Sequence, residues 1–382
     1  MKLKILIGAI VLFILFISIS IANEKNVKLK LRSCLHDLIF VPHSSLLAGS
    51  CNTEPEGSIK FWSVENGELI DRIIIDKFNT DKYEYANRIA LSHDGKFIAV
   101  AFLGKAIGVY ALEDKKWRWR VAWLEEEPYG AQAITYTNED DRVIAVGAQN
   151  TVIYNAISGE IIERQKKPLS DYPFWWGAPR GNVLSINGRY LMVWQELSRW
   201  EEHRYWWQKL LINKWVTVWD IKEKKEIAKW EKPENELCST SFSSDEKNIY
   251  IGFANGYVSK WSISEQKKVK EWNAHGGTED LDSNHYWPDD LKASPDGQML
   301  ATSGSYTVKV WDLSKAELIH EFSNVSGATS VCGIYPMAFS SDSKYFALEK
   351  NGYLCLYETE TWQEKWCVRS WPEDKWKQPN LN

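Results

Sequence analysis

Hydrophobic and polar residues alternate with a period of two along most of the chain, as in 306–311 (Tyr-Thr-Val-Lys-Val-Trp), which is typical of half-buried β-strands. The alternation is organised into a recurring unit: an apolar strand, a turn resembling Ser-x-Asp-Gly, a second apolar strand, and a third strand that ends in an aromatic residue. The turns of the unit occupy residues 40–44, 91–95, 136–140, 184–188, 242–246, 293–297 and 339–343. Seven copies are therefore predicted, the first being the weakest.

The aromatic residues that end the third strands keep step with the turns. They are Trp62, Tyr110, Tyr154, Trp219, Trp261, Trp311 and Tyr357. Successive members lie 42–50 residues apart, except for one interval of 65 between Tyr154 and Trp219. Asn255-Gly256 and Asn351-Gly352 add the turn dipeptides of antiparallel hairpins. A unit of about four short strands cannot bury both faces of its sheet alone, and closing seven sheets into a ring solves this problem.

The predicted fold is all-β, with seven blades between residues 27 and 370 and a C-terminal tail at 371–382. The expected blades cover 34–76, 87–123, 131–165, 182–231, 237–273, 288–323 and 332–369. Two segments compete for the outer position of the last blade: residues 27–32 and Glu364–Arg369. We expect the N-terminal strand to pair next to the C-terminal one.

Several motifs resemble the WD40 repeat family. They are Val218-Trp219-Asp220, Val310-Trp311-Asp312, Ser294-Pro295-Asp296-Gly297 and His275-Gly276. The resemblance implies a seven-bladed WD40-like β-propeller that acts as a binding or scaffolding module. Only two copies keep Trp-Asp, and most lack the loop Asp and the Gly-His pair of the family's polar network. We therefore expect some distorted blades, held together by aromatic packing.

The N-terminus predicts export. Lys2 and Lys4 precede an uncharged apolar run, Ile5–Ala22, and small residues before Asn23 suit cleavage there. Residues 1–22 are a cleaved signal peptide or, because the run is long enough to span a bilayer, a retained membrane anchor. Either alternative places the protein beyond one membrane, as a periplasmic, secreted or luminal protein or an anchored one.

Composition narrows the function classes. With 44% hydrophobic and 25% charged residues and a mean hydropathy of -0.38, the chain is neither disordered nor a multi-span membrane protein. The formal charge of -5 argues against nucleic acid as a partner. The 21 tryptophans are too many for one ordinary core unless they recur at fixed positions.

Motifs for catalysis are missing from the sequence. None of the seven histidines forms the short-spaced pair of a zinc site, and neither a nucleophile elbow, a P-loop nor a dinucleotide fingerprint occurs. His275 and His285 flank the acidic stretch 279–282, for which a solvated loop is favoured over a metal site. We expect no cofactor and no catalysis. The alternative is an exported propeller hydrolase or lyase acting on a glycan or lactone. A cluster of three or more carboxylates or histidines at the mouth of the central channel would favour this enzyme, whereas a mouth lined by aromatic and neutral residues would favour binding.

The cysteines suggest two cross-strand disulfides. Cys34 and Cys51 are symmetric about the first turn, and Cys355 and Cys367 are symmetric about Thr361. Buried free thiols are the alternative, because directly opposed strand positions are demanding for a disulfide. Cys238 and Cys332 are expected to be free thiols.

The interval of 65 residues contains two loops rich in aromatic residues, at 168–180 and 198–211. Both are expected to leave the fourth blade on the same face of the ring. Their candidate ligand-binding side chains are Tyr172, Phe174, Trp175, Trp176, Trp200, Tyr205, Trp206 and Trp207. Aromatic platforms suit a protein, a peptide or a glycan; alternatively, the loops pack over one another as a small core. The alternation Trp117–Arg120 indicates packing between blades.

Overall fold

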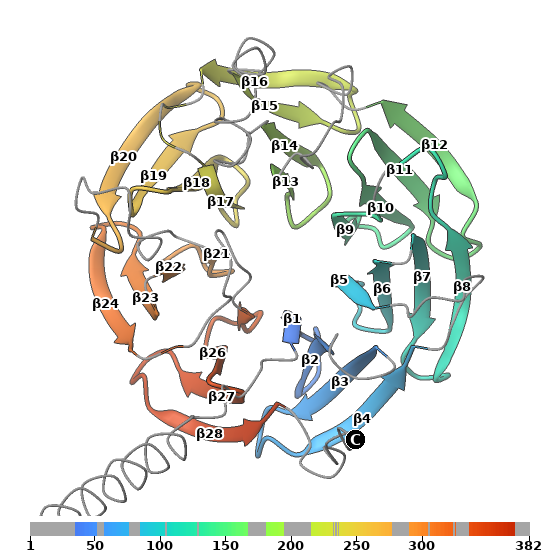
Figure 1. Cartoon of the computed structure of the whole chain (residues 1–382), viewed down its shortest axis with the longest axis horizontal. Coiled ribbons are helices and arrows are strands. Elements are labelled where there is room, and N and C mark those ends of the chain that lie inside the picture. Colours follow the sequence, from blue (N-terminus) through green and yellow to red (C-terminus); the bar gives the residue numbers. More distant parts are fainter. Residues whose placement is uncertain are drawn as a thin grey trace, which may run out of the picture. The chain divides into compact units, whose positions relative to one another are not determined.

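Seven four-stranded antiparallel sheets form the ring in the computed structural model (Figure 1). In each sheet the strands follow chain order, and we call them A to D from the centre of the ring outward. The structure describes residues 35–370 except 52–56, 76–84, 104, 128–129, 167–180, 195–214, 232, 234, 236, 277–289, 305, 324 and 326–335. The described residues all belong to one compact unit, Ser33–Asn382, and residues 1–32 are not part of it.

The strand bounds follow the predicted blades closely. The first three blades are β1 (Leu35–Phe40), β2 (Leu46–Cys51), β3 (Ser58–Ser63), β4 (Leu69–Ile74); β5 (Ala86–Leu91), β6 (Phe97–Phe102), β7 (Ala106–Ala111), β8 (Lys116–Ala122); and β9 (Ala133–Tyr136), β10 (Arg142–Val146), β11 (Asn150–Asn155), β12 (Ile161–Lys166). The fourth and fifth are β13 (Gly181–Leu184), β14 (Tyr190–Trp194), β15 (Trp215–Asp220), β16 (Lys225–Glu231); and β17 (Leu237–Phe242), β18 (Asn248–Phe253), β19 (Tyr257–Ser262), β20 (Lys267–Asn273). The last two are β21 (Asp290–Ala293), β22 (Met299–Gly304), β23 (Thr307–Asp312), β24 (Glu317–Phe322); and β25 (Met337–Phe339), β26 (Tyr345–Lys350), β27 (Tyr353–Glu358), β28 (Glu364–Arg369).

The predicted all-β, seven-bladed fold is confirmed, and the described residues contain no helix. The expectation of distorted blades is wrong. Every blade has four strands, and each C–D pair carries a register shift next to its third-strand aromatic residue. Local turn chemistry and aromatic packing explain this regularity without the family's full polar network.

In four of the seven A–B turns a serine organises the hairpin locally. In the second blade, Ser92 Oγ donates to Asp94 Oδ1 at 2.6 Å and accepts the Phe97 amide at 3.0 Å. The same pair of bonds occurs at Ser243, Ser294 and Ser340. Such side-chain bonds to nearby backbone groups favour turns. Glycine at position 95 has φ +70°, and a Cβ there would meet the Pro42 carbonyl oxygen at 2.4 Å.

Aromatic residues join neighbouring blades by a repeated contact. The D strand of one blade places an aromatic ring against the third-strand aromatic of the next. These pairs are Trp119–Tyr154, Trp230–Trp261, Trp272–Trp311 and Phe322–Tyr357, with ring centroids 4.6–6.3 Å apart. Such pairs add to the free energy gained from burying the rings. The high tryptophan content thus reflects one contact used several times around the ring.

The sequence Trp117-Arg118-Trp119-Arg120 serves this packing. Trp117 packs on the core between the first two blades, whereas Trp119 belongs to the core between the second and third. Arg120 lies over the rings of Phe102 and Trp117, 5.1 and 4.9 Å from their centroids. The predicted role in blade-to-blade packing is confirmed.

Side chains close the ring between the last blade and the first. The outer strand of the last blade is β28, the more C-terminal of the two segments that the sequence offered for this position. The other segment, residues 27–32, lies outside the described residues. Trp366 Nε1 donates to the Val64 carbonyl oxygen at 2.9 Å. A buried polar group supports the junction: Lys60 Nζ donates to the Ser370 carbonyl oxygen at 3.2 Å, and Ser370 Oγ donates to the buried Glu349 at 2.6 Å.

Candidate binding face

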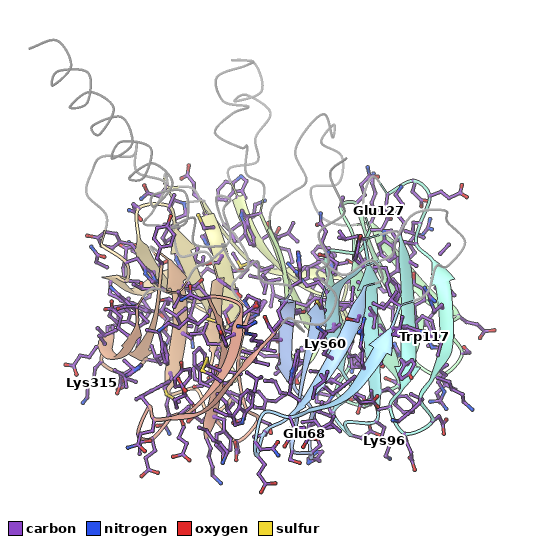
Figure 2. All side chains as sticks on the ribbon, turned by 60° about the horizontal axis from the view of Figure 1, so that its bottom comes forward. Lys60, Glu68, Lys96, Trp117, Glu127 and Lys315 are labelled. Carbon is purple, nitrogen blue, oxygen red and sulfur yellow. A yellow bond between two sulfur atoms is a disulfide. The ribbon has the colours of Figure 1, made fainter. Side chains whose placement is uncertain are left out.

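The ring has two chemically different faces. We call the face that carries the A–B and C–D turns the turn face, and the opposite one, with the B–C turns and the connections between blades, the loop face. In Figure 2, Glu68 and Lys96 mark the turn face at the bottom, and Glu127 lies toward the loop face at the top. The A strands begin at the loop face and run toward the turn face.

The two aromatic-rich loops begin and end at strand termini on the loop face. Gly181 pairs with Trp194 across the first two strands of the fourth blade, and Trp215 pairs with Glu231 across the last two. Lys166, opposite Asn150, ends the preceding blade on the same side. The candidate side chains themselves, Tyr172, Phe174, Trp175, Trp176, Trp200, Tyr205, Trp206 and Trp207, lie outside the described residues.

Charged residues on three of the inner strands lie near the loop face. Asp37 on β1 accepts the Ile89 amide of the next blade at 3.2 Å. Arg88 on β5 is close enough to act electrostatically on His36 and Asp290, and Asp290 and Lys292 on β21 approach each other to 3.8 Å. These positions are close to the start of their A strands. The described part of the mouth therefore combines two carboxylates with two cations.

Burial shifts the ionisation of this group. Desolvation raises the pKa of Asp290, although the nearby Lys292 and Arg88 oppose the rise. Desolvation, assisted by Arg88, lowers the pKa of His36 on β1. The neutral histidine and the partly desolvated carboxylate share Arg88 as a neighbour. Sequence reasoning missed this group because its members are separated by up to about 250 residues and meet only when the ring closes.

Glu127 anchors the loop face between the second and third blades. Its fully buried carboxylate accepts the amides of Ala148, Gln149 and Asn150 at 2.7–3.1 Å and the Asn150 side-chain amide at 3.0 Å. These donors belong to the B–C turn of the third blade. A carboxylate with this many donors is satisfied despite its burial. In the sequence Glu127 ends a run of three glutamates, which by itself indicates only a solvated segment.

His275 belongs to a buried polar cluster of the sixth blade. Its Nε2 lies 2.9 Å from Thr302 Oγ1, which also accepts the Trp311 indole N–H at 3.0 Å, and its Nδ1 lies 3.3 Å from Thr307 Oγ1. Both ring nitrogens are thus engaged with hydroxyl groups. His285 and residues 279–282 lie outside the described residues, so the alternatives of a metal site and a solvated loop are not tested there.

We expect His275 to make stability depend on pH. Burial lowers the pKa of His275 to about 3, whereas an unfolded histidine titrates near 6.5. The unfolded chain therefore binds the proton more readily, and stability falls as the pH drops from 6.5 toward 3. Linkage predicts a loss of about 2 kcal/mol between pH 7 and pH 5. Denaturant unfolding at both pH values should show this loss, and His275→Gln should reduce it; parallel pH dependence in both proteins would contradict the assignment.

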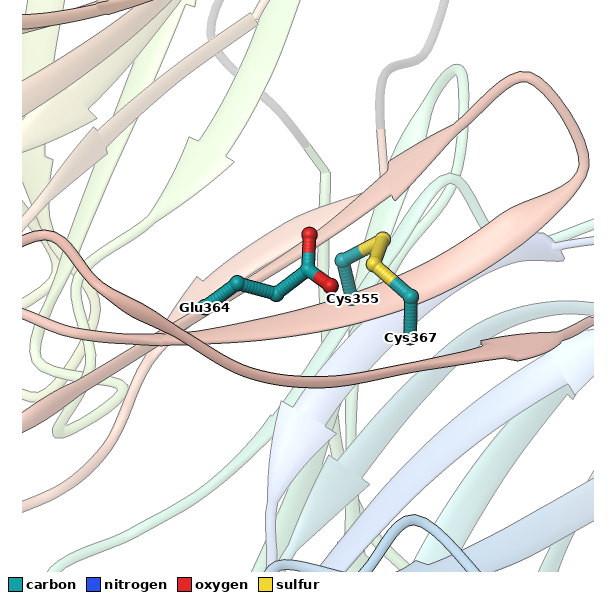
Figure 3. Close-up of side chains that lie close together, drawn as sticks. All are labelled: Cys355, Glu364 and Cys367. Carbon is teal, nitrogen blue, oxygen red and sulfur yellow. A yellow bond between two sulfur atoms is a disulfide. The ribbon is translucent and has the colours of Figure 1, made fainter.

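The last blade contains a disulfide between directly opposed strand positions. Cys355 and Cys367 pair across β27 and β28 and are bonded, with their Cα atoms 4.1 Å apart (Figure 3). Glu364 lies beside them, and the three ligand atoms fall within 4.8 Å of one another. Because the sulfur atoms are bonded to each other, neither is a thiolate that would bind a metal. Cys51 is also disulfide-bonded, whereas Cys34 and Cys332 lie outside the described residues, and Cys238 is a half-buried thiol on β17.

The family model described as WD domain, G-beta repeat matches residues 267–312. This segment runs from β20 to the end of β23 and contains His275, Thr302 and Trp311. The chain is a seven-bladed β-propeller that contains a WD40 repeat at residues 267–312. WD40-repeat propellers typically act as scaffolds for protein interactions.

The fold of this WD40-repeat propeller is similar to the solved structure of U3-55K. The TM-score is 0.63 and the sequence identity 15%, and the similarity covers 84% of this chain and 90% of that one. At this identity the likeness concerns the fold. A search of the curated proteins found no match. Within the described part of the propeller, no helix is long and apolar enough to cross a bilayer, and the predicted segment 1–22 lies outside that part.

Proposed function

We propose that this WD40-repeat propeller is a non-catalytic, exported scaffold that binds a protein or peptide partner on its loop face. The observation that carries the proposal is that both aromatic-rich loops begin and end on the same face of the ring. The strand ends that flank them, Lys166, Gly181, Trp194 and Trp215, all lie on that face. Eight aromatic side chains in these loops would offer a partner apolar contact area on the loop face.

Electrostatics favours a polypeptide over a nucleic acid. Among the described residues at the channel mouth, Asp37 and Asp290 balance the charges of Arg88 and Lys292, so this part has no excess of positive charge. The chain as a whole is acidic, and phosphate binding needs clustered cations. A protein or peptide surface with both charge signs fits the mouth; a glycan remains the second ligand class that stacking on aromatic rings supports.

The cysteine chemistry supports export. Disulfides persist in oxidising compartments and are rare in the cytosol. The disulfide between Cys355 and Cys367 and the disulfide-bonded state of Cys51 suit an oxidising compartment. Such a compartment is where the signal peptide or anchor predicted at residues 1–22 would place the protein. N-terminal sequencing of natively produced protein tests this part: Asn23 or a neighbour indicates cleavage, Met1 in a membrane fraction indicates an anchor, and a soluble cytoplasmic protein starting at Met1 contradicts both.

Truncating the loop aromatics tests the binding site. Trp175→Ala, Trp206→Ala and Trp207→Ala should each weaken a captured partner by about 1–3 kcal/mol, or roughly five- to more than a hundredfold. The thermal midpoint should stay unchanged, since a contact with a partner does not hold the free protein together. Partner affinity and thermal midpoint are measured for the same samples, after the partner is captured from the native extracellular or periplasmic milieu and identified.

A matched control separates binding from packing. Trp215 is 42% exposed at the start of β15, just beyond the second loop, and Trp215→Ala should change affinity less than the loop variants do. If the loops instead form a small core, the three truncations should cost about 3–5 kcal/mol of stability. A large drop in midpoint with unchanged affinity of the folded fraction would refute binding through these side chains.

A second candidate function is a hydrolase or lyase acting on a glycan or lactone. The observation in its favour is the pair of opposed shifts at the channel mouth, where burial raises the pKa of Asp290 and lowers the pKa of His36. Groups shifted in this way can serve as an acid and a base. If the protein is such an enzyme, Asp290→Asn should abolish turnover and Trp175→Ala should leave turnover in place. If it is a scaffold, Trp175→Ala should weaken partner binding and Asp290→Asn should leave partner binding in place.

A further inference from the structure

The A–B turns of neighbouring blades touch one another at six of the seven junctions on the turn face. The amides of His93 and Asp94 donate to the Asp140 carboxylate at 2.8 and 3.0 Å. The Asp296 amide donates to Ser343 Oγ at 3.1 Å, and the Asn187 amide donates to Glu246 at 3.4 Å. At the other three of these junctions, glycines 95, 188 and 297 lie against the preceding turn so closely that a Cβ would come within 3.1 Å.

The seventh junction, between the last blade and the first, is open. The first blade has Val41-Pro42-His43-Ser44 where the other turns begin with serine or threonine, and its positive φ falls on His43. Ser44 Oγ donates to the Val41 carbonyl oxygen within the turn. A cleft of about 320 Å³ occupies the junction, in the range of small ligand sites. We call it the turn-face cleft.

The walls of the turn-face cleft have three chemical components. Phe40, Val41, Val64 and Tyr345 supply apolar and aromatic surface; four serines, at positions 44, 45, 340 and 341, supply hydroxyl groups. Charged groups stand at its exposed edge. They are Glu65, Asp342 and Lys365.

Lys365 shows how this surface accepts a cation. Its Nζ lies 5.5 Å from the centroid of the Tyr345 ring, within the range of a cation–π contact. Asp342 already accepts Ser340 Oγ at 2.7 Å and has Lys344 Nζ at 3.5 Å. Glu65, in contrast, forms no ion pair with any other described residue. The lining of the cleft therefore includes both an aromatic ring, that of Tyr345, and an exposed carboxylate, that of Glu65, without an ion pair to another described residue.

We propose that the turn-face cleft binds an arginine or lysine side chain presented by a partner protein. The methylene stem would lie along Phe40, Val41 and Val64, and the charged head would reach Glu65 beside the Tyr345 ring, where Lys365 acts as the chain's own competitor. A basic partner also complements the net charge of -5. This site lies on the opposite face from the aromatic loops and does not depend on the function proposed for them.

Saturation-transfer NMR on the full chain tests the proposal with N-acetyl-arginine methylamide as the probe. N-acetyl-lysine methylamide is the second cation, and the norleucine and glutamate analogues are the uncharged and anionic comparators. We expect saturation of the arginine or lysine methylenes and a weaker effect on norleucine and glutamate. Glu65→Gln should weaken the cation about two- to fivefold, and Lys365→Gln should strengthen it by a similar factor, as expected for exposed ion pairs.

Two controls make the result specific to the cleft. Glu68→Gln removes an exposed carboxylate from the same C–D turn but outside the cleft, and it should leave the affinity unchanged. Tyr345→Leu should weaken cation binding, whereas Tyr345→Phe should retain it, because both tyrosine and phenylalanine present an aromatic face. Thermal midpoints confirm that the variants are folded. Equal saturation of norleucine, preference for glutamate, or a loss of cation binding in Lys365→Gln would each overturn the proposal.

Discussion

Trp366→Ala is expected to lower the free energy of unfolding by about 3–5 kcal/mol, the usual cost of truncating a buried aromatic residue. Trp366 is only 8% exposed and packs, with Trp62, in the core shared by the first and last blades. Glycine at position 67 lies under its ring, where a Cβ would come within 2.8 Å. Each described sheet is built from four consecutive strands, so side chains such as Trp366 connect the two ends of the ring.

Thermal and denaturant unfolding measure the effect, and two variants calibrate it. Trp366→Phe keeps most of the packing and loses the bond from Nε1 to the Val64 carbonyl oxygen, so it should cost about 1 kcal/mol. Trp215→Ala truncates an exposed tryptophan on β15 and should cost much less than Trp366→Ala. A midpoint for Trp366→Ala equal to that of Trp215→Ala would mean that the ring closes through other contacts.

Glu127→Ala is expected to cost about 3–5 kcal/mol, because it leaves several buried amide donors without their shared acceptor. The donors are the backbone amides at 148–150 and the Asn150 side chain, all in the B–C turn of the third blade. Urea unfolding gives the free energy directly. Loss of this anchor should also loosen the turn, which faster amide hydrogen exchange at 148–150 would report.

The adjacent glutamate is the matched control. Glu126 is exposed, and its carboxylate forms a surface ion pair with Arg164 at 2.6 Å. Surface ion pairs contribute about 0–1 kcal/mol, so Glu126→Ala should change stability by no more than that. If the two variants lose a similar free energy of unfolding, Glu127 stabilises the fold through its charge alone and not through the hydrogen bonds that it accepts.

The repeat was readable from the sequence because its determinants are local. A serine that bonds to an aspartate two residues on and to an amide five residues on specifies the A–B hairpin within six residues, as at Ser92 and Ser294. Period-two alternation identifies the strands around it. Trp62 and its six equivalents supply one aromatic residue per repeat, and their regular spacing predicted seven blades closed into a ring.

The sequence by itself determined the hairpins and the number of blades, and it predicted the export signal. Each of these depends on residues close together in the chain. Only the tertiary structure decided which residues meet across blades. It made Glu127, one of three consecutive glutamates, a buried anchor, and it grouped His36, Asp37, Arg88 and Asp290 at one mouth of the ring. The turn-face cleft beside Val41 is likewise visible only in the tertiary structure. These contacts join residues from different blades, and their chemistry depends on burial, which arises only when the ring closes and removes water from between the sheets.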